Sequence, residues 1–498
     1  MSNGFSDLQN GSDIRGVAMD GVEGESVNLT ESEAVATGSA FSHWLSMKVG
    51  KNAFDLQVCV GHDPRLSAEP LVRGLMKGMC CFGTRVSDAG LASSPAMFMS
   101  TVMPYYEFDG AIMVTASHLP FNRNGFKFFT AEGGLDKEDI AEILRLASKV
   151  YTRAEYYEKE DVTLMDMYAA HLRSIITGEL KGDLKGMKIA VDAGNGAGGF
   201  FAEKVLAPLG ADISGSQFLE PDGHFPNHIP NPENPEAMDS ICRRVRETGS
   251  DLGIIFDTDV DRSAAVTSSG APLGRNEIVA LAAALGAEKH PGGTVVTDSI
   301  TSNGLHDFLT QDLGLKHFRY RRGYRNVINK AVELADKGED AFLAIETSGH
   351  AAYSDNYYLD DGAYLAAMIV AAAAKLKRDG NGVESLIEGL PVPAEAKEFR
   401  LSVSTDDFSS VAAAVLDGMR EWASSAAGLS LAEPNHEGVR VNYDIDGATG
   451  WFLLRKSLHD PLLPLNIESD SIGGVRIAAD IIADFLSRFD GVDTSLLK

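Results

Sequence analysis

The chain has 498 residues, 44% of them hydrophobic and 23% charged, which is enough for about three to five globular domains. Its formal net charge of −27 argues against a nucleic-acid partner, because such partners need a basic face. The charge leaves an anionic small-molecule substrate open, since a few local arginines can outweigh a distant acidic surface.

Cysteine usage and apolar runs indicate the compartment. The four cysteines form no CxxC motif, and Cys80 and Cys81 are adjacent, which favours a reducing environment. The opening residues show no targeting pattern, and the apolar run 363–374 is too short to cross a bilayer. We therefore expect a cytoplasmic protein without a membrane partner; a trimmed organelle precursor would have the same features.

Strand-like and helix-like segments alternate along most of the chain, which is typical of α/β proteins. The pattern predicts strands at 55–63, 84–90 and 110–117 and helices at 67–81 and 136–150. A polar stretch at 151–162 is a plausible linker, and a helix follows near 164–177.

Two further α/β units follow the linker. The second has strands at 187–199 and 250–261 with a helix at 236–248, and the third runs from about residue 271. In the third unit we expect helices at 276–287, 303–311, 324–337 and 361–377 and strands at 293–300 and 341–348. After 389–403 the pattern becomes antiparallel, with strands at 439–445 and 450–457 and a last helix at 473–488.

A serine and a histidine follow the strand at 110–117. Ser117 and His118 open a loop rich in Pro, Asn and Gly, with Lys127 close behind. A lone serine at a strand end is most often a turn or capping residue. The functional alternative is a nucleophile or phosphoryl carrier, with Lys127 as an acid, a base or a neutralising charge.

Three alternating aspartates follow the next buried strand. Asp257, Asp259 and Asp261 repel one another unless a cation collects them, and ligands that offer only oxygen suit Mg²⁺. An EF-hand does not fit, because its glycine and glutamate positions hold Arg262 and Ser268. The sequence therefore predicts a magnesium loop here.

Two later loops offer polar groups. Glu346, Ser348 and His350 surround a glycine at a strand end, and this set suits sugar hydroxyls or a helix cap. A cluster of donors in the segment 453–461, at the end of the strand predicted at 450–457, suits a phosphate or an ordinary basic loop. Its members are Arg455, Lys456, Ser457 and His459.

Two other patterns point to different chemistry. Residues 194–199 fit the G-x-G-x-x-G dinucleotide fingerprint, with Glu220 downstream. His224 and His228 have the spacing of zinc ligands, but Pro226 disrupts the helix that would place them on one face. We interpret 224–228 as a rigid loop.

Taken together, the loops resemble those of the α-D-phosphohexomutases, the family of phosphoglucomutase and phosphomannomutase. The matching segments are NGSDIRG (10–16), VGHDPRLSAEPL (60–71), SSPAMF (93–98), TASHLP (115–120), DTDVDR (257–262) and ETSGH (346–350). Their order along the chain also matches, and the resemblance covers nearly the whole length.

The resemblance implies a fold of three similar α/β domains with mixed sheets and a C-terminal α+β domain around a central cleft. The implied boundaries are 1–160 for a phosphoserine-loop domain, 161–270 for a metal-loop domain, 271–388 for a sugar-recognition domain and 389–498 for a phosphate-binding domain. It also implies a hexose phosphate substrate, glucose 1,6-bisphosphate as an activator, and a monomer or homodimer.

The resemblance also implies residue roles. Ser117 would carry the phosphoryl group and share Mg²⁺ with the three aspartates, while His118, Lys127 and Arg15 would assist catalysis. The substrate would meet Arg262, Arg325, Glu346, Ser348 and His350. Its non-reacting phosphate would meet Arg455, Lys456, Ser457 and His459.

Several positions depart from the family pattern. Leu119 replaces asparagine, Thr258 replaces glycine, and Leu458 and His459 replace a glycine and a threonine of the phosphate loop. The last change makes a sugar-phosphate-binding pseudoenzyme one alternative, and residues 194–199 make a dinucleotide-dependent dehydrogenase another. The preferred sugar stays open among glucose, mannose and amino sugars, with Thr347 favouring the first two by resemblance.

Overall fold

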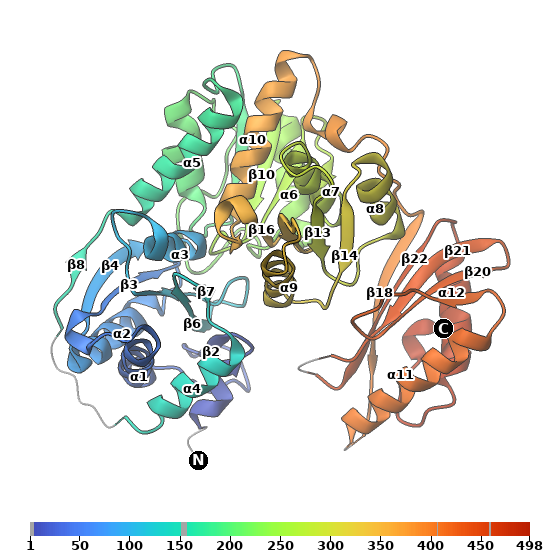
Figure 1. Cartoon of the computed structure of the whole chain (residues 1–498), viewed down its shortest axis with the longest axis horizontal. Coiled ribbons are helices and arrows are strands. Elements are labelled where there is room, and N and C mark those ends of the chain that lie inside the picture. Colours follow the sequence, from blue (N-terminus) through green and yellow to red (C-terminus); the bar gives the residue numbers. More distant parts are fainter. Residues whose placement is uncertain (1–3, 151–156, 406, 458–459) are drawn as a thin grey trace. The chain divides into compact units, whose positions relative to one another are not determined.

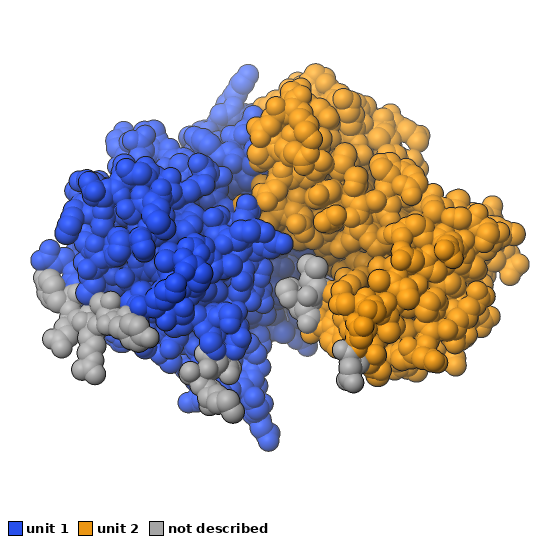
Figure 2. Space-filling model, turned by 60° about the horizontal axis from the view of Figure 1, so that its bottom comes forward, with its two compact units in different colours: residues 1–285, 348–386 blue, residues 286–347, 387–498 orange. Residues whose placement is uncertain are grey.

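The computed structural model describes residues 4–150, 157–405, 407–457 and 460–498 (Figure 1). It divides into two compact units, coloured in Figure 2: residues 1–285 with 348–386, and residues 286–347 with 387–498. We call them unit 1 and unit 2 and describe each by itself. In the described part of the chain, no helix combines the length and the apolar character that a membrane span needs.

The first sheet of unit 1 has the strand order β1-β2-β6-β5-β3-β4-β8, with β7 paired to β6. Strands β3, β4, β5 and β8 run parallel, whereas β6 is antiparallel to β5 and β2, so the sheet is mixed. Its strands are β1 (Gln9–Asn10), β2 (Asp13–Val17), β3 (Gln57–His62), β4 (Arg85–Leu91), β5 (Gly110–Val114), β6 (Arg123–Thr130), β7 (Gly133–Gly134) and β8 (Glu160–Asp161).

Helices cover this sheet. Val58 and Val60 of β3 and Ile112 of β5 share a core with α1, α2 and α4, while Gly61 of β3 lies against Met97 of α3. Helix α1 can approach α2 closely because Gly38 has no side chain. A Cβ at this position would collide with the carbonyl of Leu75. The helices are α1 (Glu31–Val49), α2 (Ala68–Phe82), α3 (Ser94–Val102) and α4 (Lys137–Ala147), with short turns η1 (Phe5–Leu8) and η2 (Ala53–Asp55).

The second sheet of unit 1 has the order β12-β11-β10-β9 and is also mixed, because β9 and β10 are parallel and β11 is antiparallel to β10. Helix α6 packs on it through Ile241 and Val245, and α10 contacts β10 and β11. The elements are α5 (Leu164–Leu180), β9 (Ile189–Asp192), η3 (Phe201–Leu206), η4 (Ala207–Leu209), α6 (Pro235–Thr248), β10 (Leu252–Phe256), β11 (Ser263–Thr267), β12 (Pro272–Leu273), α7 (Asn276–Ala287), β16 (Ala351–Tyr353), η6 (Ser354–Asn356), β17 (Leu359–Asp360), α10 (Gly362–Arg378) and η7 (Val383–Ile387).

Unit 2 contains the parallel strands β14, β13 and β15, on which α9 packs. It also contains an antiparallel sheet of order β18-β22-β21-β20-β19, whose core is shared with α11 and α12. The elements are β13 (Thr294–Thr297), α8 (Asn303–Asp307), η5 (Phe308–Asp312), β14 (Lys316–Arg319), α9 (Tyr324–Asp336), β15 (Leu343–Ile345), β18 (Glu395–Ser402), α11 (Phe408–Ser425), β19 (Leu429–Leu431), β20 (Val439–Ile445), β21 (Ala448–Leu454), β22 (Leu462–Ser469), α12 (Gly474–Leu486) and η8 (Ser495–Leu497).

The predicted fold class is confirmed: mixed α/β sheets are followed by an antiparallel sheet with helices. Two long helices, α1 and α11, were not among the predicted elements. The predicted linker at 151–162 lies partly outside the described residues, and its described end contains β8.

Candidate active site

Ser117 stands in an unusual backbone conformation at the end of β5. Its φ of 49° lies in the left-handed region, which side chains with a Cβ rarely adopt. The Thr115 hydroxyl accepts the Ser117 N–H at 2.9 Å and itself donates to Asp63 Oδ2 at 2.7 Å. A strained serine held by buried hydrogen bonds at a strand end is a feature of functional loops.

Arg65 holds the backbone of this loop through hydrogen bonds to its carbonyl groups. Its guanidinium donates to the carbonyls of Ser117, Leu119 (2.7 Å), Pro120 (2.7 Å) and Arg123 (3.0 Å). Asp63 pairs with Arg65 at 3.2 Å, and both side chains are fully buried. The loop is therefore fastened along its length by one buried cation, and the sequence analysis assigned no role to Arg65 or Asp63.

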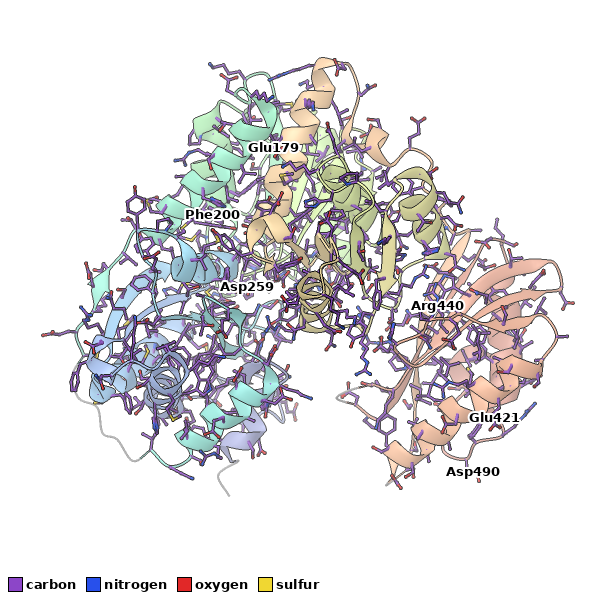
Figure 3. The ribbon with its side chains drawn as sticks, viewed as in Figure 1. Glu179, Phe200, Asp259, Glu421, Arg440 and Asp490 are labelled. Atoms are coloured by element: carbon purple, nitrogen blue, oxygen red, sulfur yellow. The ribbon has the colours of Figure 1, made fainter. Side chains whose placement is uncertain are left out.

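The three aspartates follow β10 and gather beside Ser117. One oxygen from each of Asp257, Asp259 and Asp261 lies within 4.8 Å of the others, and all three side chains are buried. The Ser117 hydroxyl donates to Asp257 Oδ2 at 3.0 Å. Asp259 is labelled in Figure 3. The structure thus brings the predicted serine and the predicted magnesium loop together.

Cations of the chain balance part of this negative charge. Lys127 Nζ lies 2.8 Å from Asp259 Oδ2 and 2.5 Å from Asp261 Oδ2. Arg262 Nη2 lies 3.2 Å from Asp257 Oδ2. Burial and the neighbouring aspartates raise the pKa of Asp257 well above its usual range, whereas Lys127 and the other nearby cations lower that of Asp261 against the effect of burial.

The donor set fits a magnesium ion. Asp259 Oδ1 and Asp261 Oδ1 are buried, and neither accepts a hydrogen bond. The other oxygen of each is taken by Lys127, and Asp259 Oδ2 also accepts from Ser94 at 2.5 Å. A hard divalent cation can satisfy carboxylate oxygens that are desolvated and accept no hydrogen bond.

His118 lies beside the serine, with Nδ1 3.3 Å from Ser117 Oγ. Arg262 Nη2 donates to the same nitrogen at 2.7 Å, so the neutral ring carries its proton on Nε2. Burial, Arg262 and Arg15 lower the pKa of His118 to about 3. Arg15 itself lies on β2 and pairs with Asp13 at 2.7 Å.

His350 also lies near the aspartates, although it comes from a later part of the chain. Its Nδ1 lies 2.6 Å from Asp360 and 3.9 Å from Asp261 Oδ1, and these carboxylates raise the pKa of His350 to about 9 against the effect of burial. Ser348, two residues earlier, is buried. The sequence analysis did not include Asp360, which lies only ten residues after His350.

The remaining predicted residues belong to unit 2. Glu346 accepts the backbone N–H of Gly323 at 2.6 Å, and Arg325 lies in the first turn of α9. Arg455 is half-buried, while the Lys456 amine donates to Ser409 at 2.9 Å. Ser457 accepts from the Asp460 N–H at 3.3 Å, and His459 lies outside the described residues.

The glycines at 194–199 support the aspartate loop. The Ala197 N–H donates to the Thr258 carbonyl at 2.8 Å, and a side chain at Gly196 would collide with Thr258. A side chain at Gly198 would meet the ring of Phe256. These glycines permit close packing on the loop, so the dinucleotide fingerprint has a structural explanation.

The two histidines at 224 and 228 have separate partners. His224 lies 2.9 Å from Asp222, and His228 lies 3.1 Å from Asp192. The interpretation of this segment as a rigid loop agrees with these contacts. The same loop leads to Asn231, which accepts from Arg262 Nη1 at 3.2 Å.

Comparison with known proteins places the chain in a family. Three models match: Phosphoglucomutase/phosphomannomutase, alpha/beta/alpha domain I over residues 7–154, domain II over 166–270 and domain III over 274–391. A phosphomannomutase/phosphoglucomutase of Pseudomonas putida is 32% identical over 455 residues, covering 90% of this chain and 92% of the relative. The chain belongs to the phosphoglucomutase/phosphomannomutase family.

Other relatives agree with this assignment. A phosphoglucomutase of Neisseria gonorrhoeae is 26% identical over 468 residues, covering 93% of each chain. The crystal structure of a phosphoglucomutase/phosphomannomutase family protein from Burkholderia thailandensis has a TM-score of 0.77 and 26% identity, covering 96% of each chain. As a phosphohexomutase, the protein is an enzyme of the isomerase class, and its family depends on Mg²⁺.

Proposed function

We propose that the protein interconverts hexose 1-phosphate and hexose 6-phosphate, with glucose or mannose as the sugar, through a phosphorylated Ser117. The observation that carries the proposal is the Ser117 hydroxyl 3.0 Å from Asp257, within a buried group of three aspartates and Lys127. A phosphoryl carrier needs this combination of a hydroxyl, a magnesium site and a cation.

The transfer conserves atoms and charge. The bond between phosphorus and Ser117 Oγ breaks as a sugar hydroxyl bonds to phosphorus, and the hydroxyl proton leaves while Ser117 Oγ gains one. The product of this half-reaction is a hexose 1,6-bisphosphate, and its other phosphate returns to Ser117 in the second half. Glucose 1,6-bisphosphate would therefore activate the enzyme by phosphorylating Ser117.

The chain's own groups have separate tasks in this proposal. Lys127 and His118 are the candidates for moving the proton, and Lys127 is the better placed because Arg262 occupies His118 Nδ1. Arg262 also lies 3.4 Å from Ser117 Oγ, where it would hold a phosphoryl oxygen. Asp257, Asp259, Asp261 and Ser117 would hold Mg²⁺. The positive charge of the ion would offset the negative charge of the transferring phosphoryl group.

Residues of unit 2 complete the proposal. Glu346, together with Ser348 of unit 1, would bind sugar hydroxyls, and Arg325 would be a further substrate-binding residue. Arg455 and Ser457 would bind the non-reacting phosphate. We further propose the domain boundaries 1–160, 161–270, 271–388 and 389–498, a monomer or homodimer, and a cytoplasmic location. The altered phosphate loop is the reason to compare sugars rather than assume one.

The test is isomerisation of glucose 1-phosphate and of mannose 1-phosphate with Mg²⁺ and a trace of glucose 1,6-bisphosphate. We expect turnover by the wild type and a loss of at least about a thousandfold in Ser117→Ala, because a covalent route is removed. Ser174→Ala, which removes an exposed hydroxyl of α5, is the matched control. A folded wild type that binds sugar phosphates without turnover would instead support the pseudoenzyme alternative.

A further inference from the structure

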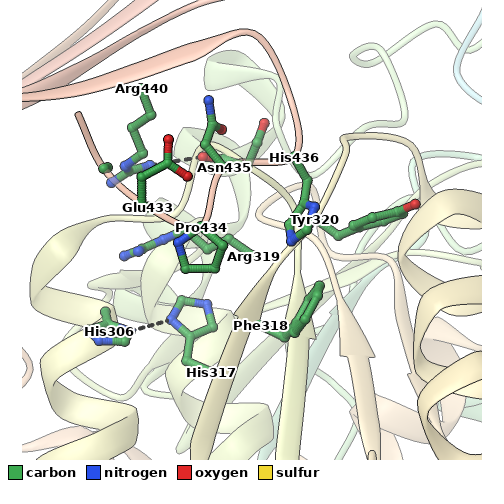
Figure 4. Close-up of a pocket in the computed structure, with 12 residues that line it drawn as sticks. His306, His317, Phe318, Arg319, Tyr320, Glu433, Pro434, Asn435, His436 and Arg440 are labelled. Atoms are coloured by element: carbon green, nitrogen blue, oxygen red, sulfur yellow. Dashed lines mark hydrogen bonds between the residues drawn. The ribbon is translucent and has the colours of Figure 1, made fainter. Parts of the chain in front are cut away.

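Unit 2 contains a pocket of about 150 Å³ that none of the predicted site residues line. It lies between β14 and the loop 432–436 that leads into β20 (Figure 4). Its volume corresponds to about five water molecules. A phosphate group with a few further atoms is of this size.

Arg440 forms one wall, and it is only 4% exposed. Its guanidinium donates to the Ser299 carbonyl at 2.8 Å and to Asn303 Oδ1 at 3.0 Å, and it lies 3.6 Å from the centre of the Trp451 ring. Its Nε is buried and has no hydrogen-bond partner. A buried donor without a partner is costly, so the chain itself compensates the Arg440 cation only in part.

Arg319 brings a second guanidinium from β14. Its Nε donates to Thr301 Oγ1 at 3.1 Å and its Nη2 to the Ser302 carbonyl at 2.6 Å, which leaves Nη1 without a partner in the described chain. No carboxylate among the described residues forms an ion pair with Arg319 or Arg440. Burial lowers the pKa of both, and that of Arg440 is lowered further by Arg319.

The nearby carboxyl groups balance this charge incompletely. The Glu468 carboxylate lies beyond ion-pair distance of both arginines but partly counteracts the lowering of their pKa. It accepts a hydrogen bond from Trp451 Nε1 at 2.7 Å. Asp298 is buried, and burial and Glu346 raise its pKa to about 7. Glu433 is the one carboxylate that lines the pocket, and it is exposed. The pocket therefore has an excess of positive charge.

Neutral donors line the same pocket. His306 Nδ1 lies 3.1 Å from His317 Nδ1 (Figure 4). His317 Nε2 lies 2.8 Å from Thr297 Oγ1. Burial lowers the pKa of both rings, so both are neutral. His317 uses both of its nitrogens in these contacts, so the N–H available to a ligand is that of His306 Nε2. The His436 ring stacks on Phe318 at 5.1 Å, which places a further imidazole over the pocket.

We propose that this pocket binds a phosphate dianion, as the free ion or as the phosphomonoester of a small metabolite. Guanidinium groups match phosphate oxygens in geometry, and an anion would offset two buried cations that no carboxylate of the described chain pairs with. Because Arg319 lies on β14 and His436 belongs to the loop before β20, the bound anion would join these two parts of unit 2.

The test is calorimetric titration of the full chain with inorganic phosphate, comparing the wild type with Arg319→Gln and His436→Ala. We expect about tenfold weaker binding or more in each variant, because charge-assisted or imidazole hydrogen bonds are lost. Arg476→Gln, an exposed arginine of α12 paired with Asp480, should bind as the wild type does. His436→Ala decides the outcome if Arg319→Gln does not fold.

Crystals soaked in tungstate locate the anion separately from the Ser117 site. Anomalous density within hydrogen-bond distance of Arg319 supports the proposal, and density confined to other sites overturns it. Unchanged phosphate binding by folded Arg319→Gln and His436→Ala also overturns it. Tighter binding of glycerol phosphate than of inorganic phosphate identifies a phosphomonoester as the ligand, and the reverse identifies the free ion. Mutase turnover measured on the same samples keeps this result distinct from the proposed activity.

Discussion

The aspartate loop of unit 1 and the arginine pocket of unit 2 both bury charged groups, but they compensate them differently. In unit 1, Asp259 and Asp261 share Lys127, and Asp257 pairs with Arg262. In unit 2, Arg319 and Arg440 donate to carbonyl, hydroxyl and amide oxygens and pair with no carboxylate of the described chain. A nearly balanced site can take a cation and an anion together, whereas a site with excess positive charge takes an anion alone.

The largest effect should come from Arg65, which fastens the serine loop of the balanced region. Replacing it in Arg65→Met leaves Asp63 buried without its partner and frees four carbonyls, so we expect a loss of about 4–5 kcal/mol in the free energy of unfolding. Denaturant unfolding measures this. The double variant Asp63→Asn/Arg65→Met should recover part of the loss, and strict additivity of the two single changes would contradict the pairing.

Lys127→Met should break the balance of the aspartates directly. We expect a loss of about 3 kcal/mol, because two buried carboxylates lose their cation. Added Mg²⁺ should raise the midpoint of unfolding more in this variant than in the wild type, since a bound ion stabilises the folded state.

The matched control for Lys127→Met is Lys185→Met, which removes an exposed lysine 2.8 Å from Asp183. It should leave stability and the magnesium response unchanged. Equal stability of Lys127→Met and the wild type without Mg²⁺ would show that Lys127 does not compensate the aspartates.

Asp298 provides a pH test of unit 2. Its pKa of about 7 in the folded state exceeds the usual 3.8, so the folded state binds its proton more tightly than the unfolded state. The resulting stabilisation is complete below about pH 4 and is lost as the pH rises to about 7. Asp298→Asn should therefore flatten this part of the stability curve, and parallel curves for variant and wild type would contradict the shifted pKa.

Arg319→Gln should have the smallest effect on stability, about 1 kcal/mol, because two hydrogen bonds are weakened and no carboxylate is left unpaired. A loss as large as that of Lys127→Met would mean that Arg319 balances a buried negative charge, and the contrast between the two regions would fail. Denaturant unfolding in phosphate-free buffer is the measurement, since a bound anion would add its own stabilisation.

The sequence revealed many of the buried strands and their terminal loops because both leave local patterns, but it missed the buried strands β6 and β11. The aspartate spacing at 257–261 and the Ser-His pair at 117–118 were visible as motifs, and the family resemblance set their order. Helix α1 was missed for a physical reason: Ala34, Ala36 and the run 37–42 are buried, so it has no regular polar face. Periodicity cannot identify a helix that is covered on most sides.

The supporting residues were harder to predict. Arg65 reaches carbonyls more than fifty positions away in the chain, and Ser94 reaches Asp259 across 165 positions. No local spacing reports such pairs. The pocket in unit 2 was missed for the same reason, since Arg319 and Arg440 come from different sheets; a charged residue in a buried strand, such as Arg440, was the one available signal.

The hydrogen bonds of Arg65 to the loop that carries Ser117 determine whether this loop or the bound sugar phosphate moves during turnover. A loop whose carbonyls at 117, 119, 120 and 123 all meet one buried guanidinium cannot swing without breaking several hydrogen bonds at once. In the proposed reaction the phosphoryl donor, Ser117, therefore keeps a fixed position in unit 1. The hexose 1,6-bisphosphate must therefore reorient between the two half-reactions. The enzyme's processivity then depends on how long this intermediate stays bound.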